Sequence, residues 1–140
     1  MFIIAIDFGT KSIGIAIGQK ITYTANPLTT IKYKNKIIFW KKIKNILEKW
    51  KPIFIIIGLP LNIDGSMQTI TKKAIKFSKE IKSKFNIDVK LQDERLTTIE
   101  AKSIIFKQKG FKHLKKNKID SMSAVIILES WLNKQRKNKK

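Results

Sequence analysis

The sequence predicts an α/β fold in which helices flank a five-stranded mixed sheet. Short apolar runs rich in isoleucine and bounded by glycine near the N-terminus have the character of buried strands. Further along, helical and strand periods alternate, which is typical of crossover connections and parallel strands covered on both faces. A length of 140 residues suits a single core, and an apolar content of 43% is enough to build it. We expect one domain over residues 1–135.

The first three strands are expected close together, at residues 2–7, 13–18 and 21–26. The first two are apolar runs and the third alternates, with Pro27 ending it. Because short connections join neighbouring antiparallel strands, we expect these three to form an antiparallel meander.

The period then changes to that of a helix. Apolar residues recur at helical spacing from Phe39 to Trp50, lysines fill the other face, and Pro52 closes the segment. Residues 53–57 are a fully apolar strand, and residues 58–66 form a loop dense in turn residues. This order predicts the first crossover.

A second helix and a fifth strand are expected next. Ser66 can cap a helix whose apolar stripe lies within residues 70–85, and residues 87–92 alternate as a strand. Thr97 and Glu100 have the spacing of a capping box, which opens a third helix.

The last helix is expected from about Ile119 to Trp131, after a lysine-rich loop. Residues 136–140 form a basic tail with no apolar anchor, which we expect to be mobile. The complete order of elements is that of the ribonuclease-H-like fold, which is the fold we predict.

Composition excludes several classes of protein. The chain has no cysteine, which excludes a disulfide scaffold, a thiolate zinc site and a cysteine nucleophile. The apolar N-terminus has no basic region before it, and Asp7 interrupts it, so it is neither a signal peptide nor a membrane span. We expect a soluble, cytoplasmic protein that has no membrane partner.

The net charge of +20 has two explanations. A basic surface gains affinity for nucleic acid because neutralised phosphates release condensed counterions. Nearly all the positive charge is lysine, however, with Arg95 and Arg136 the two arginines, and isoleucine and asparagine are also abundant. An AT-rich genome imposes that usage on any protein, so charge alone indicates compatibility with a polyanion.

The acidic residues are few and stand at the ends of predicted elements. Asp7 closes the first strand, Asp93 and Glu94 close the last strand, and Asp120 opens the final helix. Ligands bind beyond the carboxyl ends of strands in open α/β sheets, and converging carboxylates are the oxygen ligands that Mg²⁺ or Mn²⁺ requires. Two such ions about 3.5–4 Å apart can activate water and stabilise the leaving oxygen of a phosphodiester. The pattern favours a metal-dependent nuclease.

Each acid also has a structural explanation. Asp7 can satisfy backbone N–H groups in its turn, and Asp120 can complement the helix dipole. One member of the Asp93–Glu94 pair can simply pair with Arg95. Because adjacent side chains of a strand point to opposite faces, one of the two should face the cluster, and the sequence leaves open which.

Four segments together resemble a known family: DFGTKSIGIAIG (7–18), GLPLNIDGS (58–66), DERLTTIEA (93–101) and IDSMSAVIILESWL (119–132). They resemble the YqgF-type family, whose members are described as Holliday-junction-resolvase-like proteins and as pre-16S ribosomal RNA nucleases. The resemblance implies a ribonuclease-H-like fold, a cytoplasmic location and a role in maturing the 5′ end of small-subunit ribosomal RNA. It also implies a metal-dependent acidic site.

That implied site falls on Asp7, on Glu94 or Asp93, and on Asp120. Two positions depart from the family pattern. Ser12 follows Lys11 where the family usually has arginine, which removes a guanidinium that could grip a phosphate.

The second departure is Ser123, which stands where the family typically has alanine, a mild change of helix packing. Related nucleases often draw a second metal ligand from the strand before the second helix, where this chain offers Asp64. Asp64 precedes a glycine and is more typical of a turn.

Other residues near the expected site have weaker signals. Thr10 and Lys11 are candidates to meet a phosphate, and Arg95 either orients the acids or binds a phosphate. His113 is most simply a solvated loop histidine, with a role in product release as the alternative. The tryptophans have apolar neighbours at helical spacing and are expected in the core rather than as base-stacking platforms: Trp40, Trp50 and Trp131.

Three functions compete. The leading hypothesis is a metal-dependent phosphodiesterase acting on structured RNA, with lysines that position phosphates without reading sequence and with ribosome-assembly components as further partners. A Holliday-junction-resolvase-like DNA endonuclease would act on branched DNA by the same chemistry, usually as a symmetric dimer. A non-catalytic RNA-binding assembly factor is the third. The segment 7–17 also resembles the phosphate-binding turn of actin-like and sugar kinases, which need two such domains.

Overall fold

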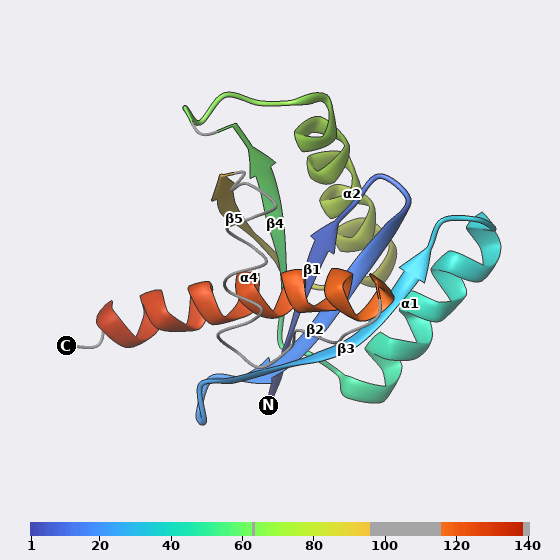
Figure 1. The fold of residues 1–140 in the computed structure, drawn as a ribbon. Helices are drawn as coiled ribbons and strands as arrows, with labels where there is room; N and C mark the ends of the chain where they lie inside the picture. The colour runs from blue at the N-terminus through green and yellow to red at the C-terminus, as the bar shows by residue number, and fades with distance from the viewer. Residues whose placement is uncertain (63, 96–115, 139–140) are drawn as a thin grey trace.

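The structure is a computed structural model that describes residues 1–62, 64–95 and 116–138 (Figure 1). Its elements follow the predicted alternation. In chain order they are β1 (Phe2–Phe8), β2 (Ser12–Gln19), β3 (Thr24–Lys32), α1 (Lys36–Trp50), β4 (Ile55–Leu61), α2 (Thr69–Phe85), β5 (Val89–Arg95) and α4 (Lys116–Asn138). The predicted third helix with Thr97 and Glu100, and also His113, lies outside the described residues.

The five strands form one mixed sheet in the order β3-β2-β1-β4-β5. β1 pairs antiparallel with β2 and β2 antiparallel with β3, which confirms the predicted meander. β4 runs parallel to β1, and β5 runs parallel to β4. The two parallel strands therefore end at the same edge of the sheet as β1.

Helices cover both faces of this sheet (Figure 1). α1 and α2 pack on one face, where Ile4 and Ile6 of β1 point. α4 packs on the other, where Ile3 and Ala5 point. Because alternate residues of β1 are buried on opposite faces, the strand reads as a continuous apolar run. Each fully buried isoleucine contributes about 1.5–3 kcal/mol through the hydrophobic effect.

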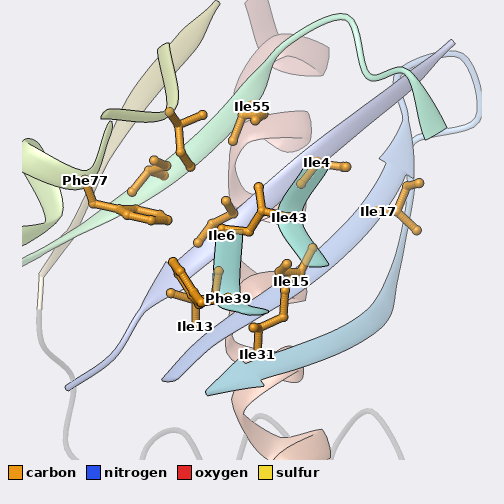
Figure 2. Close-up of a cluster of buried hydrophobic side chains, with 12 residues drawn as sticks. Ile4, Ile6, Ile13, Ile15, Ile17, Ile31, Phe39, Ile43, Ile55 and Phe77 are labelled. Atoms are coloured by element: carbon orange, nitrogen blue, oxygen red, sulfur yellow. The ribbon is translucent and has the colours of Figure 1, made fainter. Parts of the chain in front are cut away.

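Figure 2 shows the core on the α1 and α2 face, where phenylalanines from the two helices meet isoleucines of the sheet. Its buried members are Ile4, Ile6, Ile13, Ile15, Ile17, Ile31, Phe39, Ile43, Ile55, Ile57, Phe77 and Ile81. The three tryptophans are half-buried and contact the cores, as the sequence predicts: Trp40 and Trp50 pack against this cluster, and Trp131 packs against the core on the α4 face.

α4 lies close to β2 because Gly18 has no side chain. A Cβ at this position would lie 2.8 Å from Cδ2 of Leu128 and would also collide with the carbonyl oxygen of Thr24. Glycine at position 18 therefore permits both the close approach of α4 and the pairing of β2 with β3.

The prediction that Pro27 ends the third strand is wrong. β3 continues to Lys32, and Pro27 lies within it, opposite Ala16. Proline is tolerated there because β3 is at the edge of the sheet, so its missing N–H leaves no ladder hydrogen bond unmade on the open side. The pairing of β2 with β3 also shifts between Ile15 and Ala16, which is where a bulge accommodates the proline.

The predicted cap of α2 is also wrong. α2 begins at Thr69, and the backbone N–H of Gln68 donates to Oγ1 of Thr71 at 3.0 Å. Ser66 instead donates both its N–H and its hydroxyl to Asp64, at 2.8 and 2.6 Å. Asp64 is therefore the turn residue that the sequence predicts, and its local hydrogen bonds keep Ser66 out of the helix.

Two elements are longer than predicted. β4 continues through Leu61 because its pairing with β5 extends past Gly58. α4 runs from Lys116 to Asn138, so residues 136–138 of the predicted tail are helical. Within this helical end of α4, the guanidinium group of Arg136 lies 5.1 Å from the centre of the Tyr23 ring.

None of the helices in the described ranges combines the length and the apolar character needed to cross a bilayer.

Candidate active site

Asp7 stands at the carboxyl end of the central strand β1, and it is half-buried. Its partner in β2 is Gly14 and its partner in β4 is Gly58. Since residues in register point to the same face of a sheet, both flanks of the Asp7 carboxylate lack a side chain. The two glycines leave room beside the carboxylate for a ligand, a role that sequence analysis missed although both lie in the motifs it quoted.

The turn after Asp7 is held by backbone hydrogen bonds and by Tyr33. The N–H of Gly9 donates to the carbonyl of Ser12 at 3.0 Å. The Tyr33 hydroxyl donates to the carbonyl of Gly9 at 2.8 Å, and the Tyr33 N–H donates to the carbonyl of Lys11 at 3.2 Å. Exposed Thr10 and Lys11 are thus fixed at the tip of a braced turn, where each remains a candidate phosphate contact.

Tyr33 is a second residue that sequence analysis missed. Burial raises its pKa above the ordinary value of 10.0, and the negative charge of Asp7 raises it further. The phenol therefore stays protonated and remains a hydrogen-bond donor at neutral pH. Its sequence signal was weak because it lies beyond the predicted third strand, far from any acid.

The register of β5 separates its two acids. Gln92 pairs with Gly58, which itself pairs with Asp7, so these three positions share one face of the sheet. Alternation along β5 then assigns position 94 to the face of Asp7 and position 93 to the opposite face. The side chain of Asp93 is exposed. The side chains of Glu94 and Arg95 lie outside the described part of the structure.

Position 120 lies within the first turns of α4, on the Asp7 face of the sheet. It is one turn before Ser123 and two turns before Ile127, and both of these residues line a cleft together with Asp7. Helical periodicity therefore directs position 120 along the stripe that borders Asp7. The Asp120 side chain itself is among those that the structure does not describe.

The cleft beside Asp7 has a volume of about 1300 Å³. It extends from α4, over the carboxyl ends of β1 and β4, to the space between α1 and α2. Its lining residues are Asp7, Phe8, Gly9, Thr10, Tyr33, Lys36, Phe39, Trp40, Gly58, Pro60, Gln68, Thr69, Ile70, Lys73, Lys76, Phe77, Glu80, Ser123, Ile126 and Ile127. Ser123, which sequence analysis interprets as a mild change of helix packing, is thus part of the cleft wall.

The described side chains do not complete a metal site alone. Among them, no group of three aspartate, glutamate or histidine residues gathers closely enough to hold an ion. Asp7 supplies one hard oxygen donor at the floor of the cleft, and the positions of Glu94 and Asp120 share its face. Asp64 lies in the turn before α2, where it accepts two hydrogen bonds from Ser66, and it does not line the cleft.

Comparison with known proteins covers nearly the complete chain. A family model described as "RuvX: Holliday junction resolvase" matches residues 1–134. A protein of Buchnera aphidicola from Acyrthosiphon pisum, named "Putative pre-16S rRNA nuclease", is 56% identical over 133 residues, which cover 95% of this chain and 98% of that protein. A protein of the same name from Wigglesworthia glossinidia brevipalpis is 57% identical over 131 residues, which cover 94% and 91% of the two chains.

Solved structures are similar in fold. The fowlpox virus Holliday junction resolvase superposes with a TM-score of 0.61 at 20% identity and covers 96% of this chain and 99% of its own. RuvC of Thermus thermophilus gives a TM-score of 0.59 at 11% identity, with coverage of 97% and 96%. These likenesses confirm the predicted fold class, a ribonuclease-H-like five-stranded mixed sheet flanked by helices.

Proposed function

The chain belongs to the RuvX family of Holliday junction resolvases, and from this premise we propose that it is a metal-dependent nuclease that processes the 5′ end of pre-16S rRNA. Relatives that are more than half identical over nearly its full length carry the name of that activity. The proposed reaction is hydrolysis of a phosphodiester bond in structured RNA, in the cytoplasm and during ribosome biogenesis. Components of the assembling ribosome are the proposed further partners.

The observation that carries the proposal is the environment of Asp7. A half-buried carboxylate at the end of a central strand, with glycines on both sides, is costly to desolvate unless it has a ligand or a partner. Carboxylate oxygens are the donors that Mg²⁺ and Mn²⁺ prefer, so the residue types fit such an ion. We assign Asp7, Glu94 and Asp120 as the residues that would hold it. We propose no metal role for Asp93.

Bound divalent cations, two in our proposal, would lower the pKa of a coordinated water and neutralise charge on the leaving oxygen. The chain itself would position the substrate. Thr10 and Lys11 would contact a phosphate at the tip of the braced turn, and Arg95 would contact one beside the acids. Because Tyr33 remains protonated, its hydroxyl holds the Gly9 carbonyl and keeps this turn beside Asp7.

Cleavage of branched DNA is a second candidate function, favoured by the description of the family model. It would use the same acidic residues. A non-catalytic assembly factor would use none of them for chemistry. These three functions differ in substrate and in the need for Asp7, which gives the experiment its design.

The experiment compares cleavage of precursor 16S rRNA and of a four-way DNA junction in Mg²⁺, in Mn²⁺ and with chelator. The variants are Asp7→Asn, Glu94→Gln and Asp120→Asn, with Asp93→Asn as the matched control on the opposite face of β5. Loss of several kcal/mol of transition-state stabilisation lowers the rate by roughly a thousandfold, which we expect for each of the first three. Asp93→Asn should cut at nearly the wild-type rate.

Measurements of RNA binding, taken together with cleavage, distinguish the three candidate functions. Asp7→Asn should bind RNA as well as the wild type or better, because one repulsive charge is removed. Junction cleavage without RNA cleavage would favour the second candidate. RNA binding with no cleavage under any divalent ion would favour the assembly factor, and wild-type cleavage by Asp7→Asn would refute the assigned site.

A further inference from the structure

The cleft does not end at Asp7 but continues between α1 and α2. Lys36 lines it from the start of α1, and Lys73 and Lys76 line it from α2. We call this part of the cleft the α1–α2 groove. It opens at the carboxyl edge of the sheet, where both helices begin (Figure 1).

The floor of the α1–α2 groove is aromatic. Phe39 and Phe77 are almost fully buried, and their ring centres lie 6.0 Å apart (Figure 2). Trp40 is half-buried, with its ring centre 5.7 Å from that of Phe77, and Nζ of exposed Lys84 lies 4.9 Å from the centre of the Trp40 ring. Ile70, also half-buried, adds an aliphatic surface from α2. The exposed parts of Trp40 and Ile70 offer an apolar surface for flat, uncharged groups.

The walls of the groove are basic and available to a ligand. Lys36, Lys73 and Lys76 are all exposed. Ion pairs in the described ranges include those of Lys44 with Glu48 and of Lys90 with Asp88, and neither of them involves a lysine of the α2 wall. Glu80 is the acidic residue on this wall, and with Asp7 it leaves the described lining with a net positive charge.

A groove that combines an aromatic surface with cationic walls favours single-stranded over double-stranded nucleic acid. A duplex hides the faces of its bases by stacking them and presents phosphates to a protein. A single strand presents both phosphates and unstacked bases, and proteins bind it by pairing cationic walls with an aromatic surface. An aromatic floor between lysines therefore matches a single strand.

We propose that the α1–α2 groove binds the single-stranded RNA segment that adjoins the bond cleaved at Asp7. Lys36, Lys73 and Lys76 contact its phosphates. Its bases lie against Trp40 and Ile70. This inference rests on the proposed nuclease function and adds the substrate class of one subsite: the enzyme engages RNA where a single strand leaves a structured region.

The test measures RNA binding in the full chain with Asp7→Asn, so that no cleavage interferes. The ligands are an RNA hairpin with a blunt end and the same hairpin with an oligouridine extension of about ten nucleotides, a length within the range of single-strand sites. A third hairpin carries an abasic extension of equal length. We expect the oligouridine extension to tighten binding most and the abasic extension to give a smaller gain.

Lys73→Gln/Lys76→Gln is the test variant, and Lys79→Gln/Lys82→Gln is its matched control. Both pairs are exposed lysines with the same spacing on α2, but the second pair does not line the cleft. Loss of two phosphate contacts to a single strand reduces the steepness of log K against log salt by about 1.4. At 0.1 M salt this corresponds to about 25-fold weaker binding. We expect that loss for the extended hairpin with the test variant and little change with the control.

Two results would overturn the proposal. One is equal affinity of wild-type protein for the blunt and extended hairpins. The other is an equal loss for the two lysine pairs, which would indicate general electrostatic attraction. The nuclease proposal is judged separately by Asp7-dependent cleavage. If cleavage is absent while the extension still tightens binding through Lys73 and Lys76, the groove stands and the catalytic assignment fails.

Discussion

Replacing Tyr33 by phenylalanine should loosen the turn beside Asp7 without disturbing the core. The change removes the hydroxyl that donates to the Gly9 carbonyl at 2.8 Å. It retains the ring, whose centre lies 5.1 Å from that of Phe39 and 5.9 Å from that of Phe8. The Tyr33 N–H still donates to Lys11, so the consequence is confined to one end of the turn.

The size of the effect follows from that one bond. A hydrogen bond between neutral groups contributes about 0.5–1.5 kcal/mol net, and Gly9 is half-buried, so its carbonyl regains some contact with water. We expect the free energy of unfolding to fall by about 1 kcal/mol. For a domain of this size that corresponds to a fall in Tm of about 3–5 °C. The rate of cleavage should fall as well, because Thr10 and Asp7 lie on either side of Gly9.

The difference in free energy of unfolding between the wild type and Tyr33→Phe should also depend on pH. In the unfolded chain Tyr33 titrates near its ordinary pKa of 10.0, whereas burial and the charge of Asp7 raise its pKa in the native state. Between those values the unfolded state has released a proton that the native state holds, so rising pH favours unfolding. The wild-type advantage over Tyr33→Phe is therefore fully present below pH 10 and shrinks as the pH rises above 10.

Urea unfolding of both proteins at pH 7 and at several values above pH 10 measures this. Tyr23→Phe is the control, because the Arg136 guanidinium contacts the ring of Tyr23, which the change retains. Titration of lysines affects all three proteins alike and cancels in the differences. A Tyr33→Phe protein as stable as wild type at pH 7, or a difference that does not shrink above pH 10, would refute the reasoning.

Three further predictions concern the fold around the site. Gly9→Ala places a Cβ 2.7 Å from the Ser12 carbonyl oxygen, so we expect a loss of about 1–3 kcal/mol in urea unfolding; unchanged stability would mean that the turn yields easily. Ile57→Ala empties a fully buried position and should cost about 2–5 kcal/mol by the same measurement, whereas a smaller loss would indicate that the core collapses around it. Asp64→Ala removes two hydrogen bonds to exposed Ser66 and should leave the cleavage rate of precursor RNA unchanged, while a large loss of rate would return Asp64 to the metal site.

Sequence patterns predicted the sheet because its apolar runs are buried on both faces. Ile3, Ile4, Ala5 and Ile6 need no register to be recognised as a strand, and the short connections require antiparallel neighbours. Boundaries were harder where local hydrogen bonds compete with propensity. Ser66 has the chemistry of a helix cap, but Asp64 lies two residues before it and accepts both of its donors.

The candidate site shows the same division. Asp7 is a candidate on sequence alone because an acid at the end of an apolar strand is unusual. The choice between Asp93 and Glu94 required the register of β5 against β4, since a shift of one residue would exchange their faces. Gly14 and Gly58 gave no signal for a site because the sequence does not tell which residues are neighbours across strands.

The packing of α4 against β1 also has a consequence for how the protein is made. Translation produces Asp7 long before it produces α4, the helix that borders it. Until that helix leaves the ribosome, Ile3, Ala5 and Ile56 have no cover on their side of the sheet. A nascent or truncated chain therefore lacks both half of its core and one wall of the cleft, and exposed apolar surface marks such chains for chaperones and proteases. Nuclease activity therefore requires that α4 has been synthesised and has packed against the sheet.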